Sequence, residues 1–388
     1  MRKRNLARLG AGALLLAGLA CGGEEAAAPA LEDDQLERLD ALGYLDWAEA
    51  PAERDADGVV LHDARRSQPG ANLVTYPALR RAELLDADGR LLRHWEGRGH
   101  RRWERARLLP AGDLLVVVRR PAGLVRLAPD GGVVWETDLP LHHDVRILSD
   151  GRLATLTSRR LEVPEIHPGP IWDNGVALLS PEGALLEERS LLDVLASHQE
   201  RLPVVTAGIE EKEGKPLDLF HANYLDWIEA PRAPGADPRF APGAVLATLR
   251  HQDAVVLFDW RSGELLWSWG RGQLRRPHDA SVLEDGNVLI FDNQTGADAS
   301  RIVEVDPHTD RIVWEYRAPD PADFYTGTRG TVQRLANGNT LIAESNAGRG
   351  FEVTPQAEVV WEYLAPRNAD GHRPAFRLER VPLDALPQ

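Results

Sequence analysis

The sequence contains twelve histidines, and three of them occupy equivalent places in a repeated pattern. His143 lies eight residues before Gly151, and His278 lies eight residues before Gly286. His221 begins the corresponding segment of the copy between them. Three imidazoles around one cavity permit two kinds of chemistry. They can bind a metal ion that keeps an open coordination position, or one can act as a nucleophile while the others exchange protons and stabilise negative charge.

Several arginines lie close to these histidines in the sequence. Arg250 ends an apolar segment, Arg329 directly precedes the equivalent position of another copy, and Arg275 and Arg276 closely precede His278. The planar guanidinium group suits sulfate, phosphate or carboxylate. A ring of cations would also repel a divalent metal ion. The pattern therefore favours an oxyanion substrate, and we expect neither a metal nor a cofactor.

These side chains need a scaffold that brings distant segments together, and an internal repeat predicts one. Each unit has four apolar segments, with Asp-Gly or Asn-Gly turns that suit hairpins. Units of four antiparallel strands, repeated every 40 to 50 residues, are typical of propeller blades. Five full copies are visible, namely 105–135, 143–190, 221–269, 279–314 and 330–361.

A sixth copy is divided between the two ends of the chain. Residues 82–95 supply only the outer strands of a blade, and residues 375–382 supply an inner strand. Pairing of the two would close the ring and remove free sheet edges. We therefore predict an all-β protein, a six-bladed β-propeller over residues 72–388, with five blades as the alternative. We also expect a short helix in 191–202, and tryptophans that pack between blades.

The N-terminal segment has the features of an export signal. Residues 1–8 are basic, residues 9–19 are apolar but too short to span a membrane, and Cys21 follows a small residue. This arrangement resembles a bacterial lipoprotein signal, in which Cys21 would become the lipidated first residue; a plain secretory signal is the alternative. We assign 1–20 to the signal peptide and 21–71 to a tether with a helix over 31–49. The expected location is the bacterial cell envelope, facing the periplasm in a Gram-negative source.

The composition excludes several classes of protein. The net charge is −15, which argues against a nucleic-acid partner because such a protein needs a basic face. Cys21 is the only cysteine, so an intramolecular disulfide, a CxxC redox centre and a thiolate zinc site are excluded. With Cys21 assigned to the anchor, covalent catalysis must use a different nucleophile.

An ordered series of motifs resembles the arylsulfotransferase family. The series runs from about residue 140 to 361 and comprises Asp218–Asn223 (D-x-F-H-x-N), Thr248–His251, Leu266–Gly270, Pro277–Ala280, Leu289–Asn293 (ending in F-D-N), Ser300–Arg301 and Asn337–Ile342 (N-G-N-T-L-I). Two positions differ from the family pattern: Pro277 replaces a glutamine, and Tyr224 stands where a serine is frequent.

The resemblance implies a six-bladed propeller that moves a sulfuryl group from a phenolic sulfate to a phenol without a nucleotide donor. It implies that His278 is the nucleophile. His221, Asn223 and Arg250 would bind and stabilise the transferring oxygens. Charge builds on these oxygens and on the leaving phenolate, so donors and cations around a nucleophilic histidine suit the reaction.

The resemblance also implies that His142 or His143 is the acid/base, and the repeat register favours His143. We count His142 and Arg329 among the substrate-binding candidates. The expected partners are the phenolic sulfate, the phenol and, through the anchor, a membrane. Two other functions remain open on the same scaffold: a non-catalytic propeller that binds a ligand or partner, and a metal enzyme or lyase that uses the three histidines.

Overall fold

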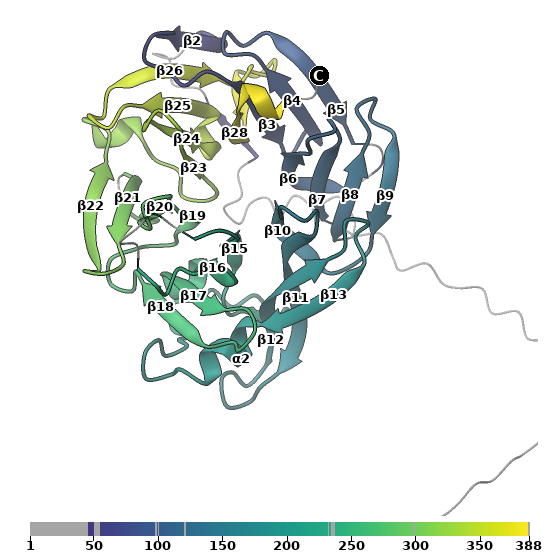
Figure 1. Cartoon of the computed structure of the whole chain (residues 1–388), viewed down its shortest axis with the longest axis vertical. Coiled ribbons are helices and arrows are strands. Elements are labelled where there is room, and N and C mark those ends of the chain that lie inside the picture. Colours follow the sequence, from purple (N-terminus) through teal and green to yellow (C-terminus); the bar gives the residue numbers. More distant parts are fainter. Residues whose placement is uncertain are drawn as a thin grey trace, which may run out of the picture. The chain divides into compact units, whose positions relative to one another are not determined.

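The computed structural model describes residues 46–49, 55–97, 99, 101–119, 122–231, 233, 237–297 and 299–386. They belong to one compact unit, Gly43–Gln388. Figure 1 shows six antiparallel sheets arranged around a central axis, each with its inner strand next to that axis. The predicted six-bladed β-propeller is confirmed.

We number the blades along the chain and give their strands from the axis outwards. Blade 1 contains β28 (Arg377–Val381), β3 (Ala71–Tyr76), β4 (Arg81–Leu85) and β5 (Leu91–Glu96). Blade 2 contains β6 (Arg102–Leu108), β7 (Leu114–Arg119), β8 (Gly123–Leu127) and β9 (Val133–Thr137). Blade 3 contains β10 (Leu141–Ile147), β11 (Leu153–Glu162), β12 (Pro170–Leu179) and β13 (Leu185–Ser190), and β14 (Leu217–Asp218) pairs with β12.

The second half of the ring follows the same plan. Blade 4 contains β15 (Ala222–Trp227), β16 (Ala244–Leu249), β17 (Ala254–Asp259) and β18 (Leu265–Trp269). Blade 5 contains β19 (His278–Val282), β20 (Val288–Asp292), β21 (Arg301–Asp306) and β22 (Arg311–Tyr316). Blade 6 contains β23 (Thr331–Arg334), β24 (Thr340–Glu344), β25 (Arg349–Val353) and β26 (Val359–Leu364), with β2 (Gly58–His62) as a fifth, outer strand.

The two ends of the chain close the ring in blade 1, as predicted. Strand β28 pairs antiparallel with β3, and Arg377 lies opposite Thr75. Both long edges of β3 are therefore hydrogen-bonded, since β4 covers its other side. The ring closes without leaving the inner edge of β3 open for pairing with another chain.

The hydrophobic core is divided among the interfaces between blades. Each of six clusters of buried side chains combines residues from two neighbouring blades. Trp95, Trp267 and Trp361 lie in these clusters, each at most 2% exposed. Their indole N–H groups donate to oxygens in the outer turn of the following blade across 3.2, 2.8 and 2.8 Å. The prediction that these tryptophans pack between blades is confirmed, and they orient each blade against the next.

The N-terminal segment differs from the predicted helix where it is described. Trp47–Glu49 form strand β1, which pairs antiparallel with β27 (His372–Pro374). The helix predicted over 31–49 is therefore wrong at its end, because the backbone there bonds to a neighbouring strand and not to itself. Residues 31–45 and the predicted signal peptide with Cys21 lie outside the described residues.

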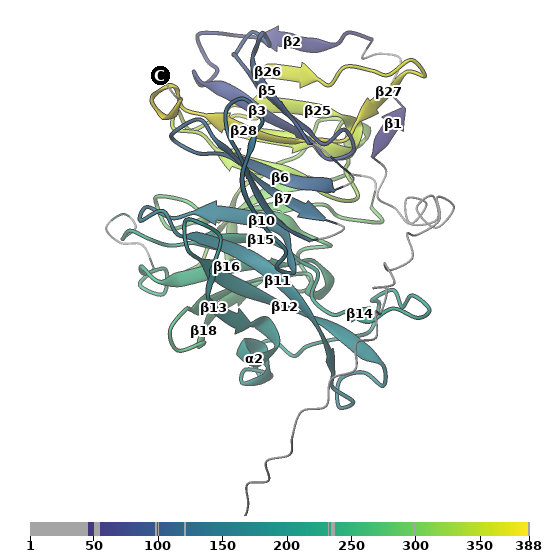
Figure 2. The same ribbon diagram turned by 90° about the vertical axis from the view of Figure 1, so that its right-hand side faces the viewer.

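Helical segments are short. The predicted helix after blade 3 is α2 (Leu191–Ala196), which begins at Ser190, whose hydroxyl accepts from the N–H of Asp193. The 3₁₀ turns are η1 (Arg250–Gln252), η2 (Pro321–Asp323), η3 (Ser345–Ala347) and η4 (Leu383–Ala385). Figure 2 shows that β11 and β12 extend beyond the neighbouring strands, so the long insertion of this repeat is the end of a hairpin. In the described part of the chain, no helix has the length and apolar character needed to cross a membrane.

Candidate active site

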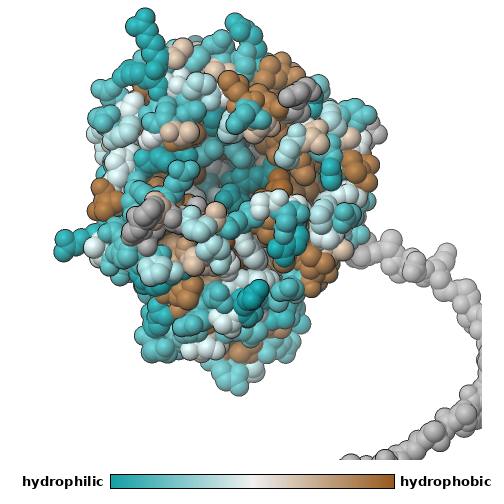
Figure 3. Space-filling view, viewed as in Figure 1, coloured by the Kyte–Doolittle hydropathy of each residue, from teal (hydrophilic) through white to brown (hydrophobic). Residues whose placement is uncertain are grey.

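The N-terminal ends of three inner strands carry a shared backbone irregularity. Strands β10, β15 and β19 each contain a register shift close to the predicted histidine. His143 and His221 have φ values of 60° and 46°, and Asp279, next to His278, has a φ of 39°. Such values cost a non-glycine residue of order 1–3 kcal/mol and are held by the surrounding structure. The bulges redirect side chains at the end of each strand, and the hollow at the centre of the ring is lined with hydrophilic surface (Figure 3).

His142 and His143 are hydrogen-bonded to each other, and the bonding fixes their tautomers. His142 Nε2 lies 2.9 Å from the carbonyl oxygen of Thr157, so this nitrogen donates. Its Nδ1 therefore accepts from His143 Nδ1, 2.7 Å away. This leaves the lone pair of His143 on Nε2, and the His143 ring lies 5.0 Å from that of His221. Of the two histidines, His143 thus contacts His221, while His142 accepts a hydrogen bond from His143 and holds its ring in place.

Burial keeps these two imidazoles neutral. It lowers the pKa of His142 to about 4. Burial, followed by the charges of His142 and His221, lowers the pKa of His143 well below its usual value. The backbone N–H of His143 donates to Glu104 of blade 2 across 2.5 Å.

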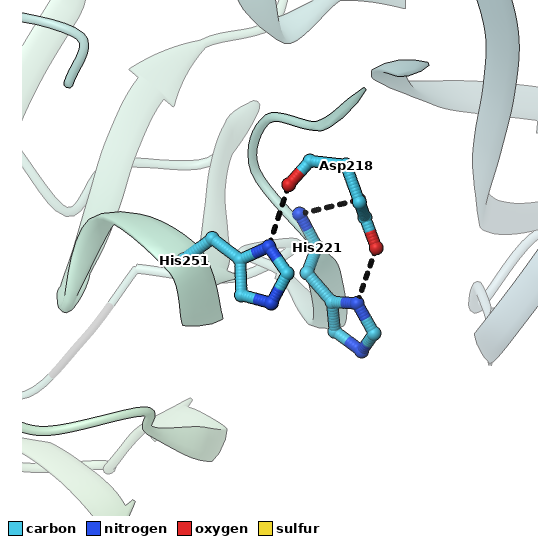
Figure 4. Close-up of side chains that lie close together, drawn as sticks. All are labelled: Asp218, His221 and His251. Carbon is cyan, nitrogen blue, oxygen red and sulfur yellow. Dashed lines mark hydrogen bonds and ion pairs between the residues drawn. The ribbon is translucent and has the colours of Figure 1, made fainter. Parts of the chain in front are cut away.

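His221 and His251 are both held by Asp218, as Figure 4 shows. The carboxylate of Asp218 accepts from His221 Nδ1 at 2.5 Å, and its backbone carbonyl accepts from His251 Nδ1 at 2.5 Å. The two rings lie 4.8 Å apart. Although burial opposes ionisation, the charge of His221 and its hydrogen bond lower the pKa of Asp218, so the carboxylate is charged. An ionised carboxylate on Nδ1 stabilises a positive charge on the His221 ring.

Arg250 donates from Nη1 to His251 Nε2 at 2.9 Å. This bond requires a neutral His251, and burial, together with the charge of His221, lowers the pKa of His251 to about 3. Arg250 forms no ion pair with a carboxylate among the described residues, and its Nε is buried without a hydrogen-bond partner. Its positive charge is therefore not compensated by a carboxylate in direct contact.

The bonds of His278 identify the nitrogen that carries its lone pair. Nδ1 lies 2.7 Å from Oδ1 of Asn293, whose amide nitrogen donates to two backbone carbonyls. The amide is thereby oriented so that its oxygen faces the histidine, and His278 Nδ1 donates. Nε2 accepts from the backbone N–H of Arg329 at 3.2 Å. Burial and the charge of Arg250 lower the pKa of His278 well below its usual value, so the ring is neutral at neutral pH.

The side chains of Asn223 and Arg329, unlike those of the predicted histidines, are engaged by other parts of the protein. Asn223 is 1% exposed, and its amide nitrogen donates to the carbonyl oxygen of Pro277, directly before His278, at 3.0 Å. Arg329 is paired through its guanidinium with Asp46 of the N-terminal segment at 2.7 Å, and Arg102 pairs with the same carboxylate. Asn223 thus positions the chain at His278, and the guanidinium of Arg329 is bound to a carboxylate.

The aspartates that follow the histidines connect inner strands. Asp144 accepts from the N–H of Leu225 in blade 4 at 3.4 Å, and Asp279 accepts from that of Val332 in blade 6 at 3.0 Å. Arg105 lies 3.2 Å from the carboxylate of Asp144 and 3.6 Å from that of Asp279. Its guanidinium carbon also lies 5.1 Å from the ring of Tyr224, the residue that departs from the family pattern. These carboxylates hold inner strands of different blades together, and among the described contacts neither bonds to the imidazole of the histidine beside it.

The structure therefore brings the predicted histidines into one region and adds residues that the sequence reasoning did not assign. His143, His221 and His251 form a chain of ring contacts. Burial, then the charge of Arg250 and, more weakly, that of His221 lower the pKa of His278. The unassigned residues are Asp218, His251 and Asn293. All three lie inside motifs that we had already recognised, and the spacing of Asp218 three residues before His221 was the available signal.

One group of side chains has the composition of a metal site. The ligand atoms of Asp218, His221 and His251 all lie within 4.8 Å of one another. Two features of this group do not suit a cation. His251 uses one nitrogen to donate and the other to accept from Arg250, and that guanidinium would repel a divalent ion. The geometry fits an anion next to Arg250 better than a cation between the histidines.

Fold and site together define a six-bladed propeller with histidines and an arginine gathered at the N-terminal ends of its inner strands. A sequence model of the arylsulfotransferase (ASST) family matches residues 107–365, more than half of the chain, and the protein belongs to that family. The resemblance seen in the motifs is confirmed. A search among curated proteins finds no match.

Solved structures share the fold at low sequence identity. A protein of unknown function from Bacteroides caccae has a TM-score of 0.52 and 16% identity, over 76% of this chain and 93% of its own. A streptogramin B lyase has a TM-score of 0.48 and 14% identity, over 86% and 97% of the two chains. A virginiamycin B lyase from Staphylococcus aureus has a TM-score of 0.46 and 12% identity, over 86% and 95%. The first likeness supports the propeller fold.

Proposed function

We propose that this protein is a sulfotransferase that moves a sulfuryl group from a phenolic sulfate to a phenol through a sulfohistidine intermediate. Membership of the ASST family supports a sulfotransferase-type activity in general. The observation that carries the finer proposal is a neutral, oriented His278 whose pKa is lowered by burial and by the charge of Arg250, a cation without a carboxylate partner in the described structure.

His278 Nε2 is the proposed nucleophile. Its lone pair attacks sulfur, the N–S bond forms, and the bond between sulfur and the aryl oxygen breaks. To do so, Nε2 must release the N–H of Arg329. That N–H then lies next to the transferred group and can donate to one of its oxygens. Asn293 continues to accept from Nδ1 and stabilises the positive charge that develops on the ring.

Arg250 supplies the charge that the three sulfuryl oxygens require. A preorganised donor aimed at developing charge is worth roughly 10²- to 10³-fold in rate. The neutral histidines around it can donate further hydrogen bonds without repelling the substrate. This environment suits a tetrahedral oxyanion.

We assign the acid/base role to His221, whereas the family resemblance pointed to His142 or His143 and the repeat register favoured His143. The Asp218 carboxylate on Nδ1 stabilises protonated His221, whereas His143 is surrounded by other histidines and loses basicity by burial. His221 would give its Nε2 proton to the leaving phenolate and recover one from the accepting phenol. That phenol then attacks sulfur, and the N–S bond breaks to regenerate His278.

The test is an assay with 4-nitrophenyl sulfate as donor and phenol as acceptor. We expect release of 4-nitrophenolate, formation of phenyl sulfate and ping-pong kinetics. His278→Asn should abolish both products, and His308→Asn, at a half-exposed histidine, is the control. An unchanged rate in His278→Asn would disprove the proposed nucleophile.

A metal-dependent enzyme is the second candidate, because of the grouping of Asp218, His221 and His251. It makes a different prediction for the same assay. Chelation with EDTA should then abolish turnover and zinc should restore it, whereas the sulfohistidine mechanism predicts no change.

A further inference from the structure

We propose that a pocket next to the catalytic histidines binds a second anionic group of the substrate, so that the preferred phenol carries a carboxylate or sulfonate. The pocket has a volume of about 510 Å³, which is in the range of sites for small organic ligands. Its lining includes His251, Asp253, Arg271, Arg275 and Arg276.

The pocket is connected to the site through one shared side chain. His251 lines the pocket, and its ring also lies 4.8 Å from that of His221. Arg250, which donates to His251, adds a further guanidinium at this junction. A substrate whose reacting oxygen lies at His221 can therefore extend its far end past His251.

The arginines of this region lack the ion pairs that are frequent elsewhere in the protein. Arg105 and Arg107 pair with Asp144, and Arg301 pairs with Asp292. Within the described ranges, no carboxylate lies within ion-pair distance of the guanidinium groups discussed next. They are those of Arg250, Arg271, Arg275 and Arg276.

Local contacts leave Arg276 partly available to an anion, whereas Arg271 donates from its two terminal nitrogens to Pro203 and Gln252 and contributes mainly its charge. Arg276 donates from Nη2 to the carbonyl oxygen of Gly208 at 2.7 Å, while its Nη1 is buried without a partner. Burial and the charges of Arg250 and Arg275 lower the pKa of Arg276, although Asp253 partly offsets them. Asp253 uses one oxygen to accept the backbone N–H of Arg276 at 2.7 Å. With three guanidinium groups against one carboxylate, the pocket is positively charged.

The protein as a whole makes this local charge unusual. Its net charge is −15, so the surplus positive charge of the pocket is opposite in sign to the charge of the protein as a whole. A guanidinium group binds oxyanions through a planar pair of donors. The small volume and its position beside the histidines fit an oxyanion borne on the aromatic substrate. The identification of the ligand as a phenol rests on the proposed function. The proposal that the pocket binds an anion does not depend on that function.

Binding is tested with molecules that cannot react. The probes are 3-phenylpropanoate, 2-phenylethanesulfonate and the uncharged 3-phenylpropanamide, titrated calorimetrically into the full protein. We expect each anion to bind about tenfold more tightly than the amide. Arg275→Gln should reduce this preference roughly fivefold, and Arg275→Glu should remove it. Arg275 is exposed, so both variants should fold.

Arg90→Gln is the matched control, because Arg90 is 76% exposed and pairs with Asp86 and Asp88 of its own turn. It should leave the preference unchanged. Equal affinity of the wild type for the acid and the amide would overturn the proposal, as would an unchanged preference in Arg275→Glu. A preference for the sulfonate alone would assign the pocket to sulfonates.

The same pocket is then tested in catalysis with two acceptors of equal phenol reactivity, 3-(4-hydroxyphenyl)propanoate and its methyl ester. The acid should have a kcat/KM about tenfold above that of the ester, and this ratio should approach one in Arg275→Glu. Anion binding without any sulfuryl transfer would refute the proposed function but would support the proposal that the pocket binds anions. Transfer without discrimination between acid and ester would refute the pocket and leave the function standing.

Discussion

The backbone N–H of Arg329 donates to Nε2 of His278 across 3.2 Å, while the guanidinium of the same residue is paired with Asp46. One residue thus contributes its main chain to the reactive histidine and its side chain to the N-terminal segment. Arg329 has a φ of 62°, which directs the N–H at the imidazole. The catalytic contribution that we expect from Arg329 therefore lies in its backbone.

Arg329→Gly separates the two contributions. Glycine adopts this φ without strain and keeps the N–H, while the ion pair with Asp46 is lost. We expect kcat for 4-nitrophenyl sulfate to stay within about threefold of wild type. Arg250→Gln, in contrast, should lower kcat/KM by roughly 10²-fold because it removes a charge at the reacting group. If the two variants lost activity equally, the assignment of Arg329 to a backbone role would be wrong.

Asp218→Asn tests the pairing of Asp218 with His221. The amide cannot stabilise a protonated imidazole as a carboxylate does, so kcat/KM should fall roughly 10²- to 10³-fold. The loss should be smaller with 4-nitrophenyl sulfate than with phenyl sulfate, since the better leaving group needs less protonation. Asp237→Asn, which changes a buried carboxylate beside His308, is the control. An equal loss with both donors would assign Asp218 a structural role only.

Acid should destabilise the protein through its buried histidines. An unfolded histidine titrates near pH 6.5, and His142 titrates near 4 because it is buried. Between these values the unfolded state binds more protons, so the free energy of unfolding falls as the pH is lowered. For His142 alone, the fall between pH 7 and pH 5 is about 2 kcal/mol.

His142→Gln isolates this effect. Glutamine can still donate to the Thr157 carbonyl but does not titrate. Denaturant unfolding of the variant at pH 7 and pH 5 should show an acid loss about 2 kcal/mol smaller than that of the wild type. An identical acid loss in His142→Gln would contradict a neutral, buried His142.

Removal of β28 should abolish the fold. A chain that ends at Phe376 leaves the inner edge of β3 unpaired. It also lacks Leu378, so Val74 and the other buried side chains between blades 6 and 1 lose a packing partner. We expect aggregation and loss of the cooperative thermal transition. A chain that ends at Leu386 keeps every described strand and should melt as the full protein does. A soluble, cooperative protein without β28 would show that closure is dispensable.

Cys21→Ala tests the proposed lipid anchor. In a bacterial host we expect the wild type in the membrane fraction and the variant in the soluble envelope fraction, since two or more acyl chains are needed for stable anchoring. Metabolic labelling with a radioactive fatty acid should mark only the wild type. Equal membrane association of both proteins would exclude lipidation at Cys21.

The fold was predictable from the sequence because the signals that determine it, the turns and the apolar segments, are local and recur in each blade. The Asp-Gly and Asn-Gly turns recur in register with apolar segments, and each copy must bury its faces against the next. The register also led to His143 and His278, and the equivalent place in blade 2 is Glu104, which accepts from the backbone of His143. The same counting could have assigned Glu104 to the site.

The remaining features depend on contacts that no local pattern contains. Asp46 reaches Arg329 across most of the chain, and Trp47–Glu49 become a strand because β27 offers a partner. The tautomers of His142, His221 and His278 depend on oxygens of Thr157, Asp218 and Asn293, and spacing cannot reveal which ring nitrogen each one meets. The pocket beside His251 is likewise assembled from separate segments.

The closure of blade 1 also sets the order in which a newly synthesised chain can fold. Its outer strands leave the ribosome first, yet their inner partner is encoded about 300 residues later. At ordinary elongation rates this interval lasts roughly 15 to 60 s. During it β3 presents an unpaired edge, and no circular arrangement of blades can be completed. Ring closure therefore waits until β28 (Arg377–Val381) has been made, and until then a holding chaperone would meet a first blade with an unpaired edge.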